Sequence, residues 1–181
     1  MGDRTHKTAV VVIPPEEVSP PIQAIRSRHD RHFRKWMPHI TLIYPFRPVH
    51  EFETIGEHFE EVCARFEPFE LELRTFKVFE HARRNCTLWL DPVPGERLKE
   101  LQSALWQVVT DCDDVRRFPG EFVPHLSIGQ VRGTEEAHRL LKGWQRTWKP
   151  IRFGVSGIGL IWREEPPDDI FRMGREVRLG G

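Results

Sequence analysis

The chain has 181 residues, with 27 basic and 27 acidic residues and a formal net charge of +0. This length suits one domain with a buried core. With 39% apolar and 30% charged residues, the composition is that of a globular protein and excludes a disordered or collagenous chain. The zero net charge argues against non-specific binding of duplex nucleic acid, while a local cationic site for a nucleotide or an RNA end stays possible.

Cysteine usage and hydropathy indicate the compartment. The three cysteines, Cys63, Cys86 and Cys112, lack C-x-x-C spacing, and their odd number argues against a disulfide framework. We expect reduced thiols in a cytoplasmic or nuclear protein. The apolar run at 8–13 is too short for a secretion signal or a membrane span, and no other stretch approaches the roughly 20 apolar residues that spanning requires. No membrane association is expected.

The amino-terminal half alternates strand-like and helix-like patterns. The β-branched run at 9–13 is typical of a strand buried on both faces. In the segment 51–66 apolar residues recur every three or four positions, as on one face of a helix. The expected elements in chain order are a strand at 9–13, a helix that opens with Pro20-Pro21, a strand at 39–46, a helix at 51–66 and a strand that begins at Phe69.

The carboxyl-terminal half repeats this order. Leucines at helical spacing follow a short apolar strand, and a loop rich in charge separates them from the next strand. The expected elements are a strand at 87–90, a helix at 98–108, a charged loop at 111–120, a strand at 122–131, a helix from Thr134, a strand-like stretch at 151–162, a turn at 166–169 and a strand at 171–179. We therefore predict one α+β domain, residues 1–181, with two similar lobes at about 7–81 and 82–181.

Two short segments with the same pattern stand in corresponding strands of the two halves. Pro38-His39-Ile40-Thr41-Leu42 and Pro124-His125-Leu126-Ser127-Ile128 both run proline, histidine, apolar, small hydroxyl, apolar. Each proline favours an extended entry to its strand. A single histidine of this kind is usually structural, but the duplication favours a functional pair.

Strand geometry groups the polar side chains of each segment. Residues two apart point to the same face, so His39 lies beside Thr41 and His125 beside Ser127, while the apolar residues face the core. If the two halves pack around an approximate two-fold axis, two imidazoles and two hydroxyls converge on one cleft. In-line displacement at phosphorus needs two proton carriers and neutral donors for the non-bridging oxygens. The pattern therefore predicts a phosphoester site.

The paired H-x-[ST] motifs, 86 residues apart, and the half-repeat order resemble the two-histidine (2H) phosphoesterase superfamily, also called the LigT-like or 2′-5′ RNA ligase-like family. The central segment from Phe76 through Trp89 to Leu101 is also similar, and the resemblance covers about residues 8–162. It implies a bilobal, pseudo-two-fold α+β fold in which two antiparallel sheets line a central cleft, with helices outside. It also implies cofactor-free, metal-independent phosphodiesterase chemistry on 2′,3′-cyclic phosphates or related 2′-linked nucleotides.

The resemblance assigns roles to the four motif residues. His39 and His125 become the acid-base pair, and Thr41 and Ser127 hold phosphate oxygens. One imidazole starts neutral to activate water and the other starts protonated, so activity is expected to be bell-shaped in pH. In many members the first motif assists the leaving 3′ oxygen and the second activates water, which implies a 2′-phosphate product. Serine at position 127, where threonine is common, keeps the donor and loses a methyl group that stiffens the rotamer.

Four further residues are candidates for substrate binding. Tyr44 follows the first motif and can reach the mouth of the cleft, and Gln130 follows the second and can donate to a phosphate or a ribose. The resemblance places Phe79 and Trp162 near the base, where stacking contributes about 1–3 kcal/mol per base. For Tyr44, Phe79 and Trp162 ordinary packing is the alternative interpretation.

The helix that opens at Pro20 carries a basic face that runs into the first motif. This face either guides an RNA backbone towards the cleft or is a solvated surface balanced by the glutamates of the next helix, and the zero net charge favours the second. Its residues are Arg26, Arg28, Arg31, Arg34 and Lys35. Arg83-Arg84, in a predicted loop, invites the same RNA-guiding interpretation, and an ordinary exposed turn is the favoured alternative.

The expected partner is an RNA 3′ end or a small nucleotide with a cyclic phosphate, bound by a monomer. The other histidines and the cysteines show no H-x-x-x-H, H-E-x-x-H or C-x-x-C grouping, so no metal site is expected. Two alternatives stay open. One is an enzyme that cleaves 2′-5′ oligoadenylate or ADP-ribose 1″,2″-cyclic phosphate. The other is a non-catalytic module that binds RNA or a nucleotide.

Overall fold

The computed structural model describes residues 3–112, 114 and 122–180. Within this part the chain forms eight strands, four α-helices and three short 3₁₀ helices. The strands are β1 (Thr8–Val12), β2 (Ile40–Ile43), β3 (Phe69–Glu80), β4 (Asn85–Val93), β5 (Leu126–Arg132), β6 (Ile151–Val155), β7 (Gly157–Trp162) and β8 (Arg172–Arg178). The helices are α1 (Pro20–His29), α2 (Phe52–Cys63), α3 (Gly95–Trp106), α4 (Thr134–Thr147) and the 3₁₀ turns η1 (Glu16–Val18), η2 (Val49–Glu51) and η3 (Ala82–Arg84).

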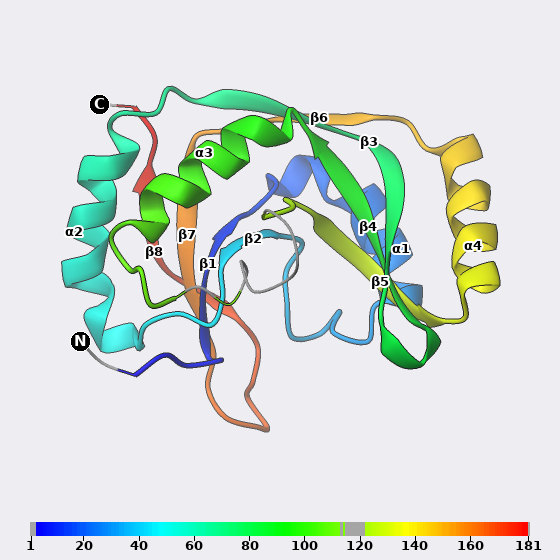
Figure 1. Cartoon of the computed structure of the whole chain (residues 1–181), viewed down its shortest axis with the longest axis horizontal. Helices are drawn as coiled ribbons and strands as arrows, with labels where there is room; N and C mark the ends of the chain where they lie inside the picture. The colour runs from blue at the N-terminus through cyan, green and yellow to red at the C-terminus, as the bar shows by residue number, and fades with distance from the viewer. Residues whose placement is uncertain (1–2, 113, 115–121, 181) are drawn as a thin grey trace.

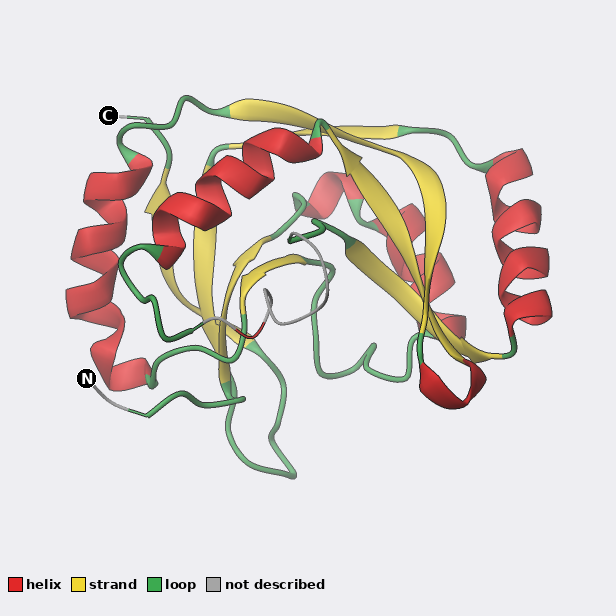
Figure 2. Cartoon of the chain, in the orientation of Figure 1, coloured by secondary structure: helices red, strands yellow, loops and turns green. Residues whose placement is uncertain are grey.

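The strands form one sheet in the order β6-β3-β4-β5-β2-β1-β7-β8, and every neighbouring pair is antiparallel. The sheet consists of two four-stranded half-sheets that meet where β2 pairs with β5, through the register pair Ile40–Leu126. The half-sheets curve strongly, with α1 and α4 beside one and α2 and α3 beside the other (Figures 1 and 2). The predicted α+β class and the helices outside are confirmed, and the two expected sheets are the halves of one continuous sheet.

The half-sheets do not follow the chain segments 7–81 and 82–181 that the sequence repeat suggested. β3 lies with β4, β5 and β6, whereas β7 and β8 lie with β1 and β2. The stretch 151–162, expected as one strand, is interrupted at Ser156: β6 pairs with β3 in one half-sheet and β7 pairs with β1 in the other. An apolar pattern shows which face of a strand is buried but not which strand is its partner, so this crossing was not predicted.

The main core lies between the helices and the face of the sheet opposite the motif hydroxyls. Helix α2 buries Phe52, Ile55, Phe59 and Cys63, which confirms the predicted helical spacing. Helix α1 packs closely on β5 because Gly129 has no side chain: a Cβ there would lie 2.8 Å from the Cβ of His29. This close approach brings the end of α1 next to the second motif strand.

Strand β5 begins at Leu126 and not at Phe122, the expected start. Pro124 precedes it and has no N–H to donate to a neighbouring strand. Residues 113 and 115–120 of the predicted charged loop lie outside the described residues. None of the helices that the structure describes is both long enough and apolar enough to cross a membrane.

Candidate active site

The two motifs meet at the centre of the sheet, on the strands that join its halves. Ile40 and Leu126 are paired and fully buried in the core. Continued in both directions, this antiparallel register sets His39 across from Ser127 and Thr41 across from His125. All four side chains are half-buried, and they share the face that we call the motif face. The predicted convergence of two imidazoles and two hydroxyls is therefore present in the structure.

Both histidines are held in the same way. Nδ1 of His39 lies 2.7 Å from the carbonyl oxygen of Met37, and Nδ1 of His125 lies 2.8 Å from that of Val123. A carbonyl oxygen only accepts, so Nδ1 donates, and the neutral ring carries its lone pair on Nε2. In each case a proline with a fixed φ separates the carbonyl from the histidine. The duplicated Pro-His pair thus presets the tautomer of both rings.

The surroundings favour the neutral form of both imidazoles. Burial is the main cause that lowers the pKa of His39 to about 4, with smaller contributions of the same sign from Arg26 and His125; the hydrogen bond to Met37 acts in the opposite direction. Burial also lowers the pKa of His125, again opposed by its backbone hydrogen bond. Each ring is therefore a proton acceptor at neutral pH, and an anion placed beside it would favour its protonated form.

The low pKa of His39 makes stability depend on pH. In the unfolded chain this histidine titrates near pH 6.5, and in the folded protein near pH 4, so the unfolded state binds more protons between these values. Stability is expected to be full above pH 6.5, to fall as the pH drops towards 4 with a slope of up to ~1.4 kcal/mol per pH unit, and to level off below. His125 adds a contribution of the same sign.

Urea unfolding at pH 7, 5.5 and 4.5 measures this loss. The variant His39→Gln is expected to show a shallower loss than the wild type, and His138→Gln, at an exposed position on α4, should match the wild type. If the free energy of unfolding falls equally steeply with decreasing pH in the wild type and in His39→Gln, the pKa of His39 is not lowered.

Aromatic rings flank each histidine. The Trp36 ring stacks on His39, with 4.6 Å between centroids, and also stacks on Phe171. On the other half-sheet, Phe79 meets the His125 ring edge-on at 5.0 Å and stacks on Trp89. These rings pack against the two histidines, and burial of this kind lowers a histidine pKa.

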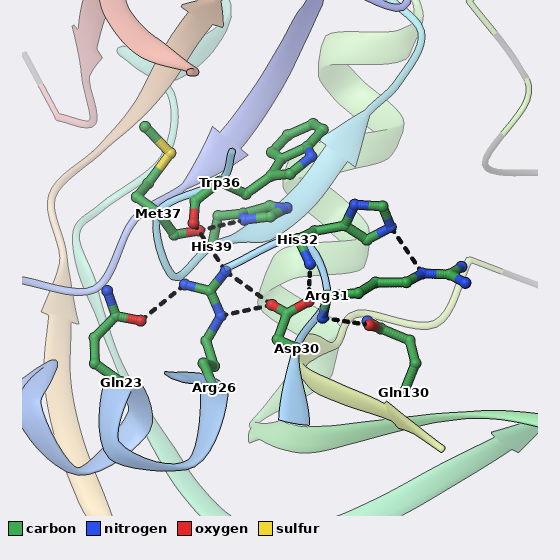
Figure 3. A network of polar contacts seen from close by, with 9 residues as sticks. All are labelled: Gln23, Arg26, Asp30, Arg31, His32, Trp36, Met37, His39 and Gln130. Carbon is green, nitrogen blue, oxygen red and sulfur yellow. Dashed lines mark hydrogen bonds and ion pairs between the residues drawn. The ribbon is translucent and has the colours of Figure 1, made fainter. Parts of the chain in front are cut away.

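A buried ion pair supports the segment that carries Trp36 and Met37 (Figure 3). Arg26 is 1% exposed, and its Nε donates to Asp30 at 2.9 Å while its Nη2 donates to the carbonyl oxygen of Trp36 at 2.8 Å. Asp30 also accepts the backbone N–H of His32. The basic-face interpretation is therefore wrong for Arg26: it follows the buried Ile22 by one helical turn and points inwards.

The hydroxyls of Thr41 and Ser127 have no hydrogen-bond partner among the described residues. The same holds for Nε2 of both histidines within this part of the chain. Buried or half-buried polar groups normally find a partner. Four groups that can donate or accept a proton therefore remain available on one face.

The four weaker candidates fall in different places. Phe79 lies against His125, and Gln130 lies farther along β5, where its side-chain oxygen accepts the backbone N–H of Arg31. Tyr44 is half-buried against Trp36 and donates to the carbonyl oxygen of His6. Trp162 lies on the helix-covered face, packed with the main core, so the structure does not bring it to the motifs.

The sequence analysis missed Trp36, Trp89 and Phe171. Trp89 had a readable signal, because it alternates with the core residues Leu88 and Leu90 and must face the other way. Trp36 stands outside any regular pattern and Phe171 opens the predicted strand at 171–179, and only the folded chain brings the two rings together. In the described part of the chain no three histidine, cysteine or acidic side chains are grouped as metal ligands.

Comparison with known proteins agrees with this geometry. The sequence pattern of the "2'-5' RNA ligase superfamily" matches residues 14–167. A protein of Geobacillus kaustophilus named "Putative phosphoesterase" is 28% identical over 137 residues, 72% of this chain and 73% of that protein. One of the same name from Bacillus cereus (strain B4264) is 30% identical over 129 residues, 68% of this chain and 69% of that protein.

Solved structures share the fold. LigT of E. coli, complexed with 3′-AMP, aligns with a TM-score of 0.62 at 15% identity, over 97% of this chain and 99% of that one. The protein TT0787 of Thermus thermophilus aligns with a TM-score of 0.60 at 21% identity, over 97% and 98% of the two chains. The chain belongs to the 2′-5′ RNA ligase superfamily and is an enzyme of the two-histidine phosphoesterase class.

Proposed function

We propose that this enzyme is a metal-independent phosphodiesterase that hydrolyses 2′,3′-cyclic phosphates at RNA 3′ ends or on nucleosides. The observation that carries the proposal is the duplicated site: two imidazoles held by the same Nδ1 hydrogen bond, each next to a free hydroxyl. All four groups come from one chain, so a monomer is sufficient. E. coli LigT, which shares the fold, is described in complex with 3′-AMP, a nucleotide with its phosphate on the ribose.

The reaction is one in-line displacement. His125 accepts a proton from water through Nε2, the water oxygen bonds to phosphorus, and the bond from phosphorus to the 3′ oxygen breaks. His39 donates a proton to that oxygen, which leaves a 2′-phosphate, and Thr41 and Ser127 donate hydrogen bonds to the non-bridging oxygens. Both rings are mainly neutral in the free enzyme at pH 7. The substrate's negative charge therefore stabilises the proton on His39 in the complex.

The test is hydrolysis of an oligoribonucleotide that ends in a 2′,3′-cyclic phosphate, with EDTA present and the product identified by phosphorus NMR. We expect EDTA-resistant conversion to a single isomer, the 2′-phosphate. A 3′-phosphate product would exchange the roles of the two histidines. No conversion would overturn the proposed substrate.

Parallel assays with 2′-5′ oligoadenylate and ADP-ribose 1″,2″-cyclic phosphate cover the other reactions that the same four groups can perform. Binding without turnover of any of these compounds would indicate a nucleotide-binding module. The three cysteines are buried thiols and are compatible with the reducing cytoplasm or nucleus, where we place the enzyme.

A further inference from the structure

A pocket that the proposed reaction does not use lies on the same half-sheet as His125. Its volume is about 420 Å³, and its polar lining comes from the segments that follow α1 and β3 and from the adjoining ends of β4 and β5. The residues that concern us are Arg31, His81, Asn85, Thr87, Gln130 and Arg132. We call it the Arg31–Arg132 pocket.

The strand register places this pocket on the motif face. Cys86 and Val131 are partners that pack into the main core, so their neighbours Thr87, Gln130 and Arg132 point to the other face, as Ser127 does. Three rows cross the half-sheet on this face: Lys77–Trp89–Ser127, then Phe79–Thr87–Gln130, then Asn85–Arg132. The pocket continues the surface of the active site.

The rows also fix the distance from the reacting phosphate. From Trp89 to Asn85 β4 advances four residues, which is about 13 Å at the ordinary rise of a strand, and the middle row lies about 7 Å from the first. A nucleotide whose cyclic phosphate sits between the motif residues brings its 5′ side towards the pocket when it lies along β4, and the proposal below takes this direction. The group that its 5′ oxygen carries is a phosphate in RNA and in 5′-phosphorylated nucleotides.

The charge of the pocket suits a phosphate. Arg31 and Arg132 form no ion pair with any carboxylate in the described part of the chain, and the lining contains no acidic residue. A second pocket of similar volume, about 440 Å³, provides the contrast: its Arg74 and Arg152 are both paired with Glu72. Only the Arg31–Arg132 pocket of these two keeps its positive charge uncompensated.

The pocket is also preorganised. The backbone N–H of Arg31 donates to Oε1 of Gln130 at 3.1 Å, which leaves the NH₂ group of Gln130 as a donor. Nε of Arg31 donates to Nε2 of His32 at 3.1 Å, and this contact orients the guanidinium (Figure 3). A planar guanidinium that is fixed in this way is well suited to bind two phosphate oxygens.

We propose that the Arg31–Arg132 pocket binds a second phosphate group, the one on the 5′ oxygen of the nucleotide that carries the cyclic phosphate. The inference rests on the proposed function for the position of that nucleotide. The preferred substrates are therefore those with at least two phosphates. The second phosphate is either the internucleotide link of an RNA 3′ end or the terminal 5′-phosphate of a mononucleotide.

Steady-state kinetics on three substrates test this assignment. They are adenosine 2′,3′-cyclic phosphate, the same nucleoside with a 5′-phosphate, and the dinucleotide ApA with a terminal cyclic phosphate. The second phosphate is expected to lower KM about tenfold, as a hydrogen-bonded charge contact does. A lower KM for the dinucleotide alone assigns the pocket to RNA. A lower KM for the 5′-phosphorylated nucleoside alone assigns it to a terminal phosphate, and an equal decrease for both substrates assigns it to both.

Arg31→Gln and Arg132→Gln are expected to raise KM about tenfold for the substrates with a second phosphate. Neither should change KM or kcat for adenosine 2′,3′-cyclic phosphate. Arg152→Gln, which removes an arginine paired with Glu72, is the matched control and should leave all three substrates unchanged. Equal KM values for the three substrates, or an equal rise for all of them in the variants, would overturn the assignment.

Calorimetry separates this inference from the proposed reaction. Adenosine 3′,5′-bisphosphate should bind the wild type about tenfold more tightly than 3′-AMP does, and Arg132→Gln should abolish the difference. This result would support the pocket even if no cyclic phosphate were hydrolysed. Equal affinities for the two ligands would overturn the pocket whatever the outcome of the turnover assays.

Discussion

His39→Ala and His125→Ala are each expected to lower kcat for the 2′,3′-cyclic phosphate by about 10²–10⁴-fold, the range for loss of a general acid or base. Both Nε2 atoms are free within the described residues, and both rings are held by a backbone carbonyl two residues upstream. The two rings act in one step, so the losses of kcat in the two single variants should not be additive. The double variant is expected to lose about as much activity as the more damaged single variant.

Each histidine should control one side of the pH profile. His125→Ala removes the base, so the residual activity should no longer fall at low pH, where that imidazole becomes protonated. His39→Ala removes the acid and should abolish the fall in activity at high pH. Single-turnover rates from pH 5 to 9 check both expectations, and exchanged effects would exchange the two roles.

A matched control separates loss of chemistry from loss of fold. His138→Ala replaces an exposed histidine on α4 and should keep wild-type kcat. The midpoints of thermal unfolding of both active-site variants should show that they are folded at the assay temperature. Either histidine variant retaining more than a tenth of wild-type kcat would contradict a role in proton transfer.

The sequence was most informative where a local pattern decides which way a side chain points. The spacing His-x-Thr and His-x-Ser predicted four polar groups on one face of two strands, and the register pair Ile40–Leu126 brings the four together. Apolar spacing likewise predicted the helices. Strand order depends instead on pairings between distant segments, and for this reason the strand-like run at 151–162, which belongs to two half-sheets, was read as one strand.

The groups that modulate the histidines were largely hidden in the sequence. Trp36 comes to His39, and Phe171 to Trp36, through the tertiary fold. The family resemblance predicted Trp162 near the base. Its neighbour Ile161 lies on the motif face with Ala9 and Val11, so strand alternation turns the Trp162 side chain to the other face. Arg26 was assigned to a basic surface because its neighbours are basic, although its spacing from Ile22 points to the core side.

Arg26→Met is expected to lower the free energy of unfolding by about 3–5 kcal/mol, since Asp30, which is 8% exposed, loses its ion-pair partner. The carbonyl oxygen of Trp36 also loses its donor. Urea unfolding at pH 7 measures the effect. Arg28→Met, on the exposed face of α1, is the control and should change stability by less than about 0.5 kcal/mol. A loss below about 1 kcal/mol in Arg26→Met would contradict the importance of the buried pair.

Arg26 is also expected to act on the reaction through His39. It holds the segment whose Trp36 ring and Met37 carbonyl fix that imidazole, and its charge is one of the causes that lower the pKa of His39. Arg26→Gln should therefore raise the pKa of His39 and lower kcat more than it raises KM. Arg26→Lys keeps the positive charge, so it should hold the pKa of His39 close to its wild-type value without restoring the position of the Trp36–Met37 segment. NMR titration of the histidine ring protons measures this shift, with His125 as the reference in the same molecule. If Arg26 only stabilises the fold, both histidine pKa values stay unchanged in the folded variant. An unchanged pKa of His39 in Arg26→Gln would therefore contradict a role of Arg26 in the reaction.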